Sequence, residues 1–365
     1  MTEQQDNAVM QPTQASATAL HTNGQAHLAA AEQPAGPLIV EARNVDKRFG
    51  RVAVLDNLTL TVEAGEIFGL IGPSGSGKTT TIHLFCGHLE PSGGTVRVLG
   101  ENPVSFSSAA RRRIGYMPQN FVLPLDLTIK QNMGFAAGLY GLSEWGSRKR
   151  IRETLELVEL WDARKRSARN ASGGMLRRLA LAATLVHDPD LIFADEPTAN
   201  LDPILRAKLW RHFRSLSASG RTLLLTTQYI DEAEYCDRVG LMYDGMLIAD
   251  GKPNDLRRRA FGGDVVAITL GDKAASAAYV VARVPGVRGT ESTRDGTLRV
   301  TVESADRAIP ALLDALDSNN ISVQSIAQVR ATFDEVFIRL IEQHGEGRPA
   351  LGRLRTSAAD MEDTE

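Results

Sequence analysis

Hydrophobic and polar positions alternate along the chain with two different periods, one typical of strands and one of helices. Residues 38–45 alternate like an edge strand, and 52–62 predict a further short strand pair. Short apolar runs predict buried strands, with helices between them, at 66–71, 191–194, 222–226 and 239–243. Strands that alternate with helices favour an α/β fold with a mostly parallel sheet.

Two other patterns lie within and after this region. Residues 123–170 are more polar and helical, and Ile151, Leu155 and Val158 share one apolar helix face because they follow at i, i+4 and i+7. After Gly262-Gly263 the pattern predicts a strand, a helix, a strand pair, a helix, a strand and a helix within 264–342. That order predicts a small α+β domain of split βαβ type after a first domain at 37–263.

The chain ends and the composition exclude several classes of protein. Residues 1–36 lack an apolar face, so we expect a disordered tail there, and 343–365 predict a polar tail. Hydrophobic residues make up 43% and charged residues 23%, which excludes wholesale disorder, a collagen-like repeat and a coiled-coil rod. We expect neither a transmembrane helix, which needs about 18 consecutive apolar residues, nor a secretory signal. Cys86 and Cys236 indicate reduced thiols of a cytoplasmic protein.

Charge argues against nucleic acid as the main partner. The net charge of the whole chain is −3. Residues 1–36 carry Glu3, Asp6 and Glu32 and no Lys or Arg, so the remainder sums to zero. Nucleic-acid binding usually selects a strongly basic surface.

The clearest motif is a phosphate-binding loop that follows the predicted strand at 66–71. It has the form G-x-x-x-x-G-K-[ST] and precedes an apolar helical run at 81–87. The expected ATP-binding residues of this loop are Gly72, Pro73, Ser74, Gly75, Ser76, Gly77, Lys78, Thr79 and Thr80. Glycines let backbone N–H groups surround β- and γ-phosphate oxygens, Lys78 supplies positive charge, and the Thr79 hydroxyl can ligate Mg²⁺. The alternative is a glycine-rich turn that binds nothing.

Two adjacent carboxylates end the predicted strand at 191–194. Neighbouring strand residues point to opposite sides, so Asp195 and Glu196 are expected to have different roles. Asp195 suits Mg²⁺ bound through water, and Glu196 suits orienting or deprotonating an attacking water. Taken alone, the two residues are better interpreted as an ordinary acidic pair at the end of a strand. Beside a phosphate loop, the catalytic interpretation is favoured.

The stretch Asn170-Ala171-Ser172-Gly173-Gly174-Met175 resembles the signature loop of ATP-binding-cassette (ABC) ATPases, with Ala171 where Leu is usual. The resemblance covers about residues 38–262. It implies a P-loop NTPase fold, with a RecA-like core and a helical subdomain at about 120–172. It also implies a Q-loop glutamine at Gln119 that joins Thr79 and Asp195 around the metal, a D-loop with Asp202, and Phe49 stacked on adenine.

The signature also has a physical interpretation. Ser172, Gly173 and Gly174 lie where a helix begins, so free N–H groups and a hydroxyl can form a second anion cradle. Alone, Ser-Gly-Gly is better interpreted as a helix N-cap. The resemblance implies a homodimer or heterodimer in which this cradle closes on ATP held by the other protomer.

Residues 226–234, 244–251 and 332–337, with the C-terminal domain, resemble the ATPases of ABC-2 exporters, and Gln228 resembles the daunorubicin-resistance type. The resemblance implies an ATP-hydrolysing subunit at the cytoplasmic face of the cell membrane. It would power a separate transmembrane permease that exports a drug, a lipid or another hydrophobic or polymeric cargo. Glu196, Lys78 and Gln228 would be the catalytic residues. The alternatives are a soluble ATP-driven switch, or a weakly hydrolysing cassette because Gln228 replaces the usual His.

Two surfaces are candidates for partner contact. The resemblance favours residues 120–145 for the permease, where Phe121, Leu123, Leu125 and Leu127 form either an apolar groove or subdomain core. Basic clusters at 111–113, 148–152, 164–169 and 257–259 favour solvated helix faces over a permease or lipid-headgroup surface.

Overall fold

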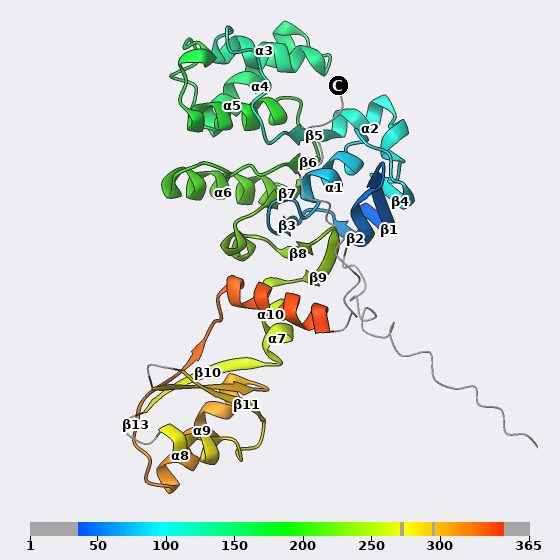
Figure 1. The fold of residues 1–365 in the computed structure, drawn as a ribbon. Helices are drawn as coiled ribbons and strands as arrows, with labels where there is room; N and C mark the ends of the chain where they lie inside the picture. Colours follow the sequence, from blue (N-terminus) through cyan, green and yellow to red (C-terminus); the bar gives the residue numbers. More distant parts are fainter. Residues whose placement is uncertain (1–35, 271–273, 294–295, 347–365) are drawn as a thin grey trace, which may run out of the picture. The chain divides into compact units, whose positions relative to one another are not determined.

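The computed structural model describes residues 36–270, 274–293 and 296–346 (Figure 1). Residues 1–35 and 347–365, which make up most of the two expected tails, lie outside this description. None of the helices in the described segments combines the length and the hydropathy that crossing a membrane requires.

A six-stranded sheet forms the centre of the first domain. Its order is β5-β6-β7-β3-β8-β9, with β9 antiparallel to β8 and the other neighbours parallel. The runs in β3, β6 and β7 are buried at every position, as parallel strands covered on both faces require. The strands are β3 (Ile67–Ile71), β5 (Ile114–Met117), β6 (Leu191–Ala194), β7 (Thr222–Thr227), β8 (Arg238–Tyr243) and β9 (Met246–Gly251).

The first domain also contains an antiparallel sheet of order β2-β1-β4, which shares a hydrophobic core with the central sheet. It consists of β1 (Leu38–Phe49), β2 (Val52–Glu63) and β4 (Gly93–Val98). The expectation of a short strand pair at 52–62 is wrong, because β2 is a single strand that pairs along its length with β1. The chain turns at Gly50, whose φ of 56° favours glycine.

Helices cover the central sheet and form a helical region beyond it (Figure 1). The side chains of Ile151 and Leu155 in α4 and of Val158, which caps its end, are buried and confirm the predicted apolar face. The helices are α1 (Lys78–Phe85), α2 (Ser108–Arg113), α3 (Ile129–Leu139), α4 (Glu144–Leu157), α5 (Gly173–Leu185), α6 (Pro203–Ala218) and α7 (Pro253–Phe261). Short 3-10 helices are η1 (Pro103–Ser105), η2 (Ala168–Asn170) and η3 (Ile230–Tyr235).

The C-terminal sheet has the order β11-β12-β10-β13 and is antiparallel throughout. Its elements follow as β10 (Asp264–Leu270), α8 (Ala274–Val281), β11 (Val287–Ser292), β12 (Thr297–Val302), α9 (Ala305–Ser318) and β13 (Val323–Val329). Val266, Ile268 and Val300 share a core with Leu312 of α9. This order confirms the predicted split βαβ type and the α/β fold class with a small α+β region.

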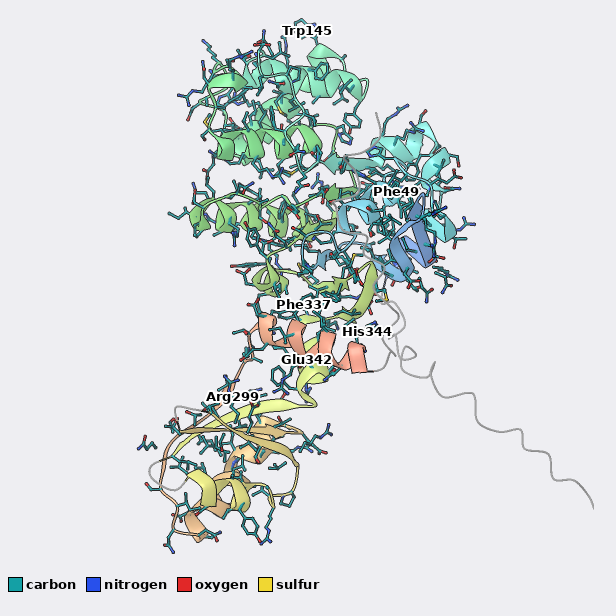
Figure 2. The ribbon with its side chains drawn as sticks, in the orientation of Figure 1. Phe49, Trp145, Arg299, Phe337, Glu342 and His344 are labelled. Atoms are coloured by element: carbon teal, nitrogen blue, oxygen red, sulfur yellow. The ribbon has the colours of Figure 1, made fainter. Side chains whose placement is uncertain are left out.

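The last helix, α10 (Phe333–Glu346), packs differently from the sequence-based expectation. Phe333, Val336, Phe337 and Leu340 lie in the core of the first domain rather than in that of the C-terminal sheet (Figure 2). Their i, i+3, i+4, i+7 spacing predicts an apolar face but not the core that receives it. The domain boundary proposed from sequence, 264–342, therefore includes a helix that packs with the first domain.

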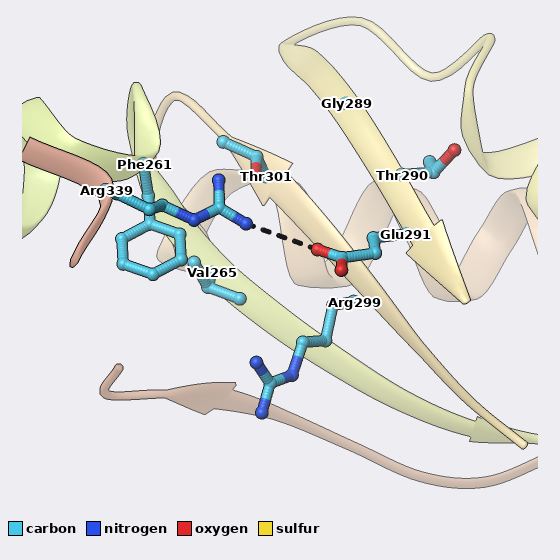
Figure 3. A pocket seen from close by; sticks show the side chains of 8 residues that line it. All are labelled: Phe261, Val265, Gly289, Thr290, Glu291, Arg299, Thr301 and Arg339. Atoms are coloured by element: carbon cyan, nitrogen blue, oxygen red, sulfur yellow. Dashed lines mark hydrogen bonds and ion pairs between the residues drawn. The ribbon is translucent and has the colours of Figure 1, made fainter. Parts of the chain in front are cut away.

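The polar face of α10 contacts the C-terminal sheet instead. Arg339 pairs with Glu291 of β11 at 3.3 Å, and Glu335 pairs with Arg299 of β12 at 3.1 Å. Arg339 also lies over the ring of Phe261, 4.2 Å from its centre. A cavity of about 170 Å³, which Figure 3 shows, is bordered by Phe261, Glu291, Arg299 and Arg339. Ion pairs thus link α10 to the sheet, and apolar packing links it to the first domain.

Arg257 of α7 departs from the expected solvated helix face. Its side chain is buried and pairs with Glu234 of η3. Its Nε donates to the Ala331 carbonyl oxygen at 3.0 Å, and the guanidinium lies over the Phe333 ring. Burial lowers the pKa of Arg257, as does the nearby charge of Arg330. Arg257 therefore joins α7, η3 and the start of α10.

Removing this guanidinium is expected to destabilise the protein. In Arg257→Ala, Glu234 and the Ala331 carbonyl lose their donor, so the free energy of unfolding should fall by roughly 2 kcal/mol. Urea unfolding followed by circular dichroism measures the change. Arg259→Ala, on an exposed position of the same helix, is the matched control. Equal shifts of the two unfolding midpoints would contradict the joining role of Arg257.

Candidate functional site

The phosphate loop lies between the end of β3 and the start of α1, where the sequence places it. Gly77 is the N-cap of α1 with a φ of 102°, a conformation that side chains other than glycine rarely adopt. At Gly72, an added Cβ would lie 2.1 Å from the Met242 carbonyl oxygen. Glycine is thus required at both ends of the loop, at Gly77 for its backbone conformation and at Gly72 for its close packing against β8.

Lys78 holds its charge inside the loop. The side chain is 4% exposed, and its Nζ donates to the carbonyl oxygens of Gly72 at 2.8 Å and Pro73 at 2.9 Å. Nζ lies 3.9 Å from Oε1 of Glu196. Burial lowers the pKa of Lys78, and the charges of Glu196 and Asp195 act in the opposite direction. The ammonium can exchange these carbonyl contacts for phosphate oxygens.

Only one of the two carboxylate oxygens of Asp195 accepts hydrogen bonds from the described residues. Its Oδ1 accepts from Thr79 Oγ1 at 3.2 Å and from Thr226 Oγ1 at 2.5 Å. Its Oδ2 is buried and has no hydrogen-bond partner. A hydroxyl and an unsatisfied carboxylate oxygen are hard ligands of the kind Mg²⁺ prefers, so these residues fit the expected cation.

Glu196 corrects one expectation from sequence. The carboxylates of Asp195 and Glu196 do not lie on opposite sides, because both contact phosphate-loop residues. The strand β6 ends at Ala194, and Glu196 has a φ of 46°, so the alternation of an extended strand does not reach it. Its backbone N–H donates to Thr226 Oγ1 at 2.9 Å, which fixes this strained residue.

Gln119 pairs with Glu196 in this structure. Its Nε2 donates to Glu196 Oε2 at 2.9 Å. Gln119, Lys78 and Glu196 are thereby brought together from three segments of the chain. The contact of Gln119 with a metal ion stays a prediction.

Gln228 and Phe49 lie at exposed edges of the site. Gln228 follows β7, and its Oε1 accepts from Ser74 Oγ at 3.0 Å, which connects it to the phosphate loop. Phe49 ends β1 and is 46% exposed, with Lys47 Nζ 4.9 Å from the ring centre (Figure 2). An exposed ring offers a stacking face, although the adenine contact remains a prediction.

The signature residues begin α5. Ser172 is its N-cap, and the Oγ accepts from the Met175 N–H at 3.3 Å. Ser172 and Gly173 are exposed, and a Cβ added to Gly173 would meet no atom within 4 Å. A Cβ at Gly174 would lie 2.5 Å from Leu205 Cδ1, so a larger residue there would displace the end of the Leu205 side chain. Across the described ranges, no hydrogen bond or ion pair joins 172–174 to the phosphate loop.

The predicted D-loop carboxylate acts as a helix cap in the structure. Asp202 Oδ1 accepts from the backbone N–H groups of Ile204 at 2.9 Å and Leu205 at 3.0 Å. This contact satisfies two of the free donors at the start of α6. Any further role of Asp202 stays a prediction.

Sequence reasoning missed two residues that organise the site. Arg177 of α5 donates to the carbonyl oxygens of Pro118, Gln119, Asp195, Glu196 and Pro197, and so ties the signature helix to both catalytic segments. Burial lowers the pKa of Arg177, against the charges of Asp195 and Glu196. Thr226 bridges Asp195 and the Glu196 backbone. Two features of the sequence could have indicated these residues. Arg177 is a charged residue one turn after Gly173, and Thr226 is a hydroxyl residue near the end of a buried strand.

Comparison with known proteins decides the family. A model described as ABC transporter matches residues 55–199, and one described as ATP-binding protein DrrA1-3-like, C-terminal domain, matches 251–341. The chain is 37% identical over 296 residues to the Daunorubicin resistance ATP-binding protein DrrA3 of Streptomyces coeruleorubidus, covering 81% of this chain and 93% of that protein. The chain belongs to the ABC transporter ATP-binding proteins. The predicted resemblance is confirmed.

Other relatives match a smaller share of this ABC protein. The Probable multidrug ABC transporter ATP-binding protein YbhF of Escherichia coli is 42% identical over 225 residues, and the match spans 62% of this chain but 39% of YbhF. The Nod factor export ATP-binding protein I of Burkholderia lata is 41% identical over 230 residues, covering 63% of this chain and 76% of that protein.

Solved structures agree with the ABC fold. An ATP-binding subunit of an ABC transporter matches with a TM-score of 0.56 and 30% identity, covering 61% of this chain and 93% of that one. A dimeric ATP-binding cassette in a post-hydrolysis state, bound to ADP and Pi, matches with a TM-score of 0.54 and 28% identity over 58% of this chain and 98% of its own.

Proposed function

We propose that this chain binds ATP and Mg²⁺, dimerises, hydrolyses ATP, and thereby powers a separately encoded transmembrane permease. One observation carries the proposal: the half-buried Thr79 and the buried Lys78, Asp195 and Glu196 meet in one cluster at the phosphate loop. The cluster contains an unsatisfied carboxylate oxygen and a buried ammonium, and a chain with no anion or cation to bind would have little use for either.

Each part of the site has a separate role in the proposed hydrolysis. Backbone N–H groups of residues 74–79 bind phosphate oxygens at the start of α1, and Lys78 adds its positive charge. Thr79 and Asp195 would hold Mg²⁺, which when bound offsets charge on the β- and γ-phosphate oxygens. Glu196, held by Gln119, orients the attacking water and accepts its proton. Phe49 offers a stacking surface for adenine.

The dimer completes each site in this proposal. The free N–H groups at the start of α5 face solvent in one chain and can cover ATP bound by another. The solved dimeric cassette with ADP and Pi supports this arrangement by analogy. A homodimer and a heterodimer both satisfy it.

The helical region supplies the surface proposed for the permease. Within the segment 120–145, Val122, Leu139 and Trp145 are 71%, 70% and 79% exposed, and Figure 2 labels Trp145. Phe121 and Leu123, by contrast, pack against the core, while Leu125 is exposed. We therefore place the protein at the cytoplasmic face of the cell membrane, attached through its permease.

The relatives' names support export as the direction. One is a daunorubicin resistance protein and another a Nod factor export protein, and these names favour a drug, a lipid or another hydrophobic or polymeric cargo. Purification of the full-length chain from membranes with a bound permease, together with Mg²⁺-dependent ATP hydrolysis, tests the proposal. Hydrolysis by a chain that never associates with a membrane protein would favour a soluble switch.

Gln228 is expected to position water without supplying charge. An amide can donate to phosphate and accept from water, whereas a His could also become an imidazolium. Gln228→Ala should lower the turnover number by about 10-fold, and Gln228→His should keep activity and add a titration near about pH 6 to 7. Initial rates of phosphate release across pH measure both effects.

The control is Gln324→Ala, which removes an exposed amide from β13. Its turnover should match that of the wild type. If Gln228→Ala also matches the wild type, Gln228 has no role in hydrolysis.

A further inference from the structure

One buried carboxyl group near the site has no role in the mechanism above. Glu232 lies in η3, four residues after Gln228, and is 1% exposed. Burial raises the pKa of Glu232, against the lowering effect of its hydrogen bonds and of Arg206. A buried carboxyl group is costly unless its partners compensate, so its contacts indicate what it holds in place.

On one side, Glu232 contacts the segment that carries Glu196. Thr198 Oγ1 donates to Glu232 Oε2 at 3.0 Å, and Thr198 is fully buried. Thr198 follows Glu196 by two residues, within a turn closed by the Ala199 N–H and the Glu196 carbonyl oxygen at 3.1 Å. The position of Thr198 therefore affects the strained backbone of Glu196.

On the other side, Glu232 belongs to the segment that carries Gln228. The Glu232 N–H donates to the Tyr229 carbonyl oxygen at 3.2 Å, which closes a turn directly after Gln228. The Tyr229 N–H in turn donates to Thr227 Oγ1 at 3.0 Å, at the end of β7. The backbone of Glu232 is thus fixed to the turn directly after Gln228, which connects its carboxyl group to that segment.

Arg206 of α6 contacts both Glu232 and Tyr229. Its Nε lies 3.7 Å from Glu232 Oε1, and its guanidinium lies over the Tyr229 ring, 4.0 Å from the centre. The side chain of Arg206 is 23% exposed, whereas the Glu232 carboxylate is closed off from solvent. One buried carboxylate therefore connects α6, the turn after Glu196 and the turn after Gln228.

We propose that Glu232 is a positioning residue for ATP hydrolysis, which fixes the segment carrying Gln228 against the segment carrying Glu196. This inference rests on the proposed function of the site. Glu232 contacts neither nucleotide nor water in the proposed mechanism and acts through the two residues that do. Its loss should therefore affect the chemical step more than nucleotide binding.

The test measures steady-state ATP hydrolysis by full-length variants, with ATP affinity determined separately by titration with a fluorescent ATP analogue. Glu232→Ala should lower the turnover number by about 10-fold or more and change KM for ATP by less than about twofold. Glu232→Gln keeps an acceptor for the Thr198 hydroxyl and should recover activity to within about threefold of the wild type.

A second pair of variants tests the contact itself. Thr198→Val removes the hydroxyl and keeps the shape of the side chain. If the hydrogen bond is the link, the double variant Glu232→Ala with Thr198→Val should be no slower than Glu232→Ala alone. A multiplicative loss in the double variant would overturn the proposed link.

Glu66→Ala controls for simple destabilisation. Glu66 is a partly buried carboxyl group paired with an arginine, Arg238, but it precedes β3, and within the described part of the chain its carboxylate bonds only to Arg238 and the Glu63 N–H. Its variant should lose stability and keep turnover within about twofold of the wild type. Equal turnover in the two alanine variants, or a Glu232→Gln variant as slow as Glu232→Ala, would overturn the positioning role and leave the proposed function intact. A wild-type chain with no turnover would overturn both.

Discussion

Replacing Glu196 with glutamine is expected to lower the ATP turnover number by about 10²- to 10³-fold, because the amide keeps the shape of the side chain but accepts no proton. The amide of the variant still occupies the positions of both carboxylate oxygens. These are Oε1, which lies 3.9 Å from Lys78 Nζ, and Oε2, which lies 2.9 Å from Gln119 Nε2. ATP binding should therefore persist, and with hydrolysis blocked the ATP-bound dimer should accumulate.

Two measurements on purified full-length Glu196→Gln protein check this result. Phosphate release gives the turnover number, and size-exclusion chromatography with and without ATP gives the fraction of dimer. Glu66→Gln is the matched control, since it also neutralises a partly buried carboxyl group. Near-normal hydrolysis by Glu196→Gln would remove Glu196 from the catalytic role.

Combining two inactive variants is expected to restore activity, because each site is proposed to use residues of both protomers. Lys78→Ala removes the phosphate charge within one chain, and Ser172→Ala with Gly173→Asp places a carboxylate where the partner's phosphates would bind. Each variant alone should lose nearly all hydrolysis. Random mixing gives half mixed dimers with one intact site of two, hence about a quarter of the wild-type rate.

The structure makes Gly173→Asp suitable for this test. A side chain at Gly173 meets no atom within 4 Å, and an acidic residue in the first turn of α5 suits the helix dipole, so the monomer should fold normally. Gly174→Asp is less suitable, because its Cβ would displace the end of the Leu205 side chain. Variants that fold and dimerise, but regain no activity when mixed, would contradict the shared site.

Local rules accounted for the parts of the site that lie next to one another in the sequence. The glycines around Lys78 and the helix start at Ser172 follow from backbone geometry that a short motif specifies. The succession of strands and helices in the C-terminal region was likewise predicted from the alternation of apolar patterns.

Contacts between distant segments could not be read in this way. Gln119 and Glu196 are 77 residues apart in the sequence, and Thr226 reaches Asp195 from a different strand. No periodicity records such a pairing, because the fold alone decides which strand ends are neighbours. The positive φ of Glu196, which turns its side chain toward the phosphate loop, is likewise a consequence of these tertiary contacts.

The position of α10 makes the C-terminal sheet an insertion between two helices of the first domain. Leu256 and Ala260 of α7, before the sheet, and Phe337 of α10, after it, belong to one hydrophobic core. A chain that ends after Gly263 would therefore lose more than the sheet: it would expose the apolar surface that α10 covers, and aggregation would follow. A short linker from α7 to α10 would instead delete the sheet alone and leave that core closed.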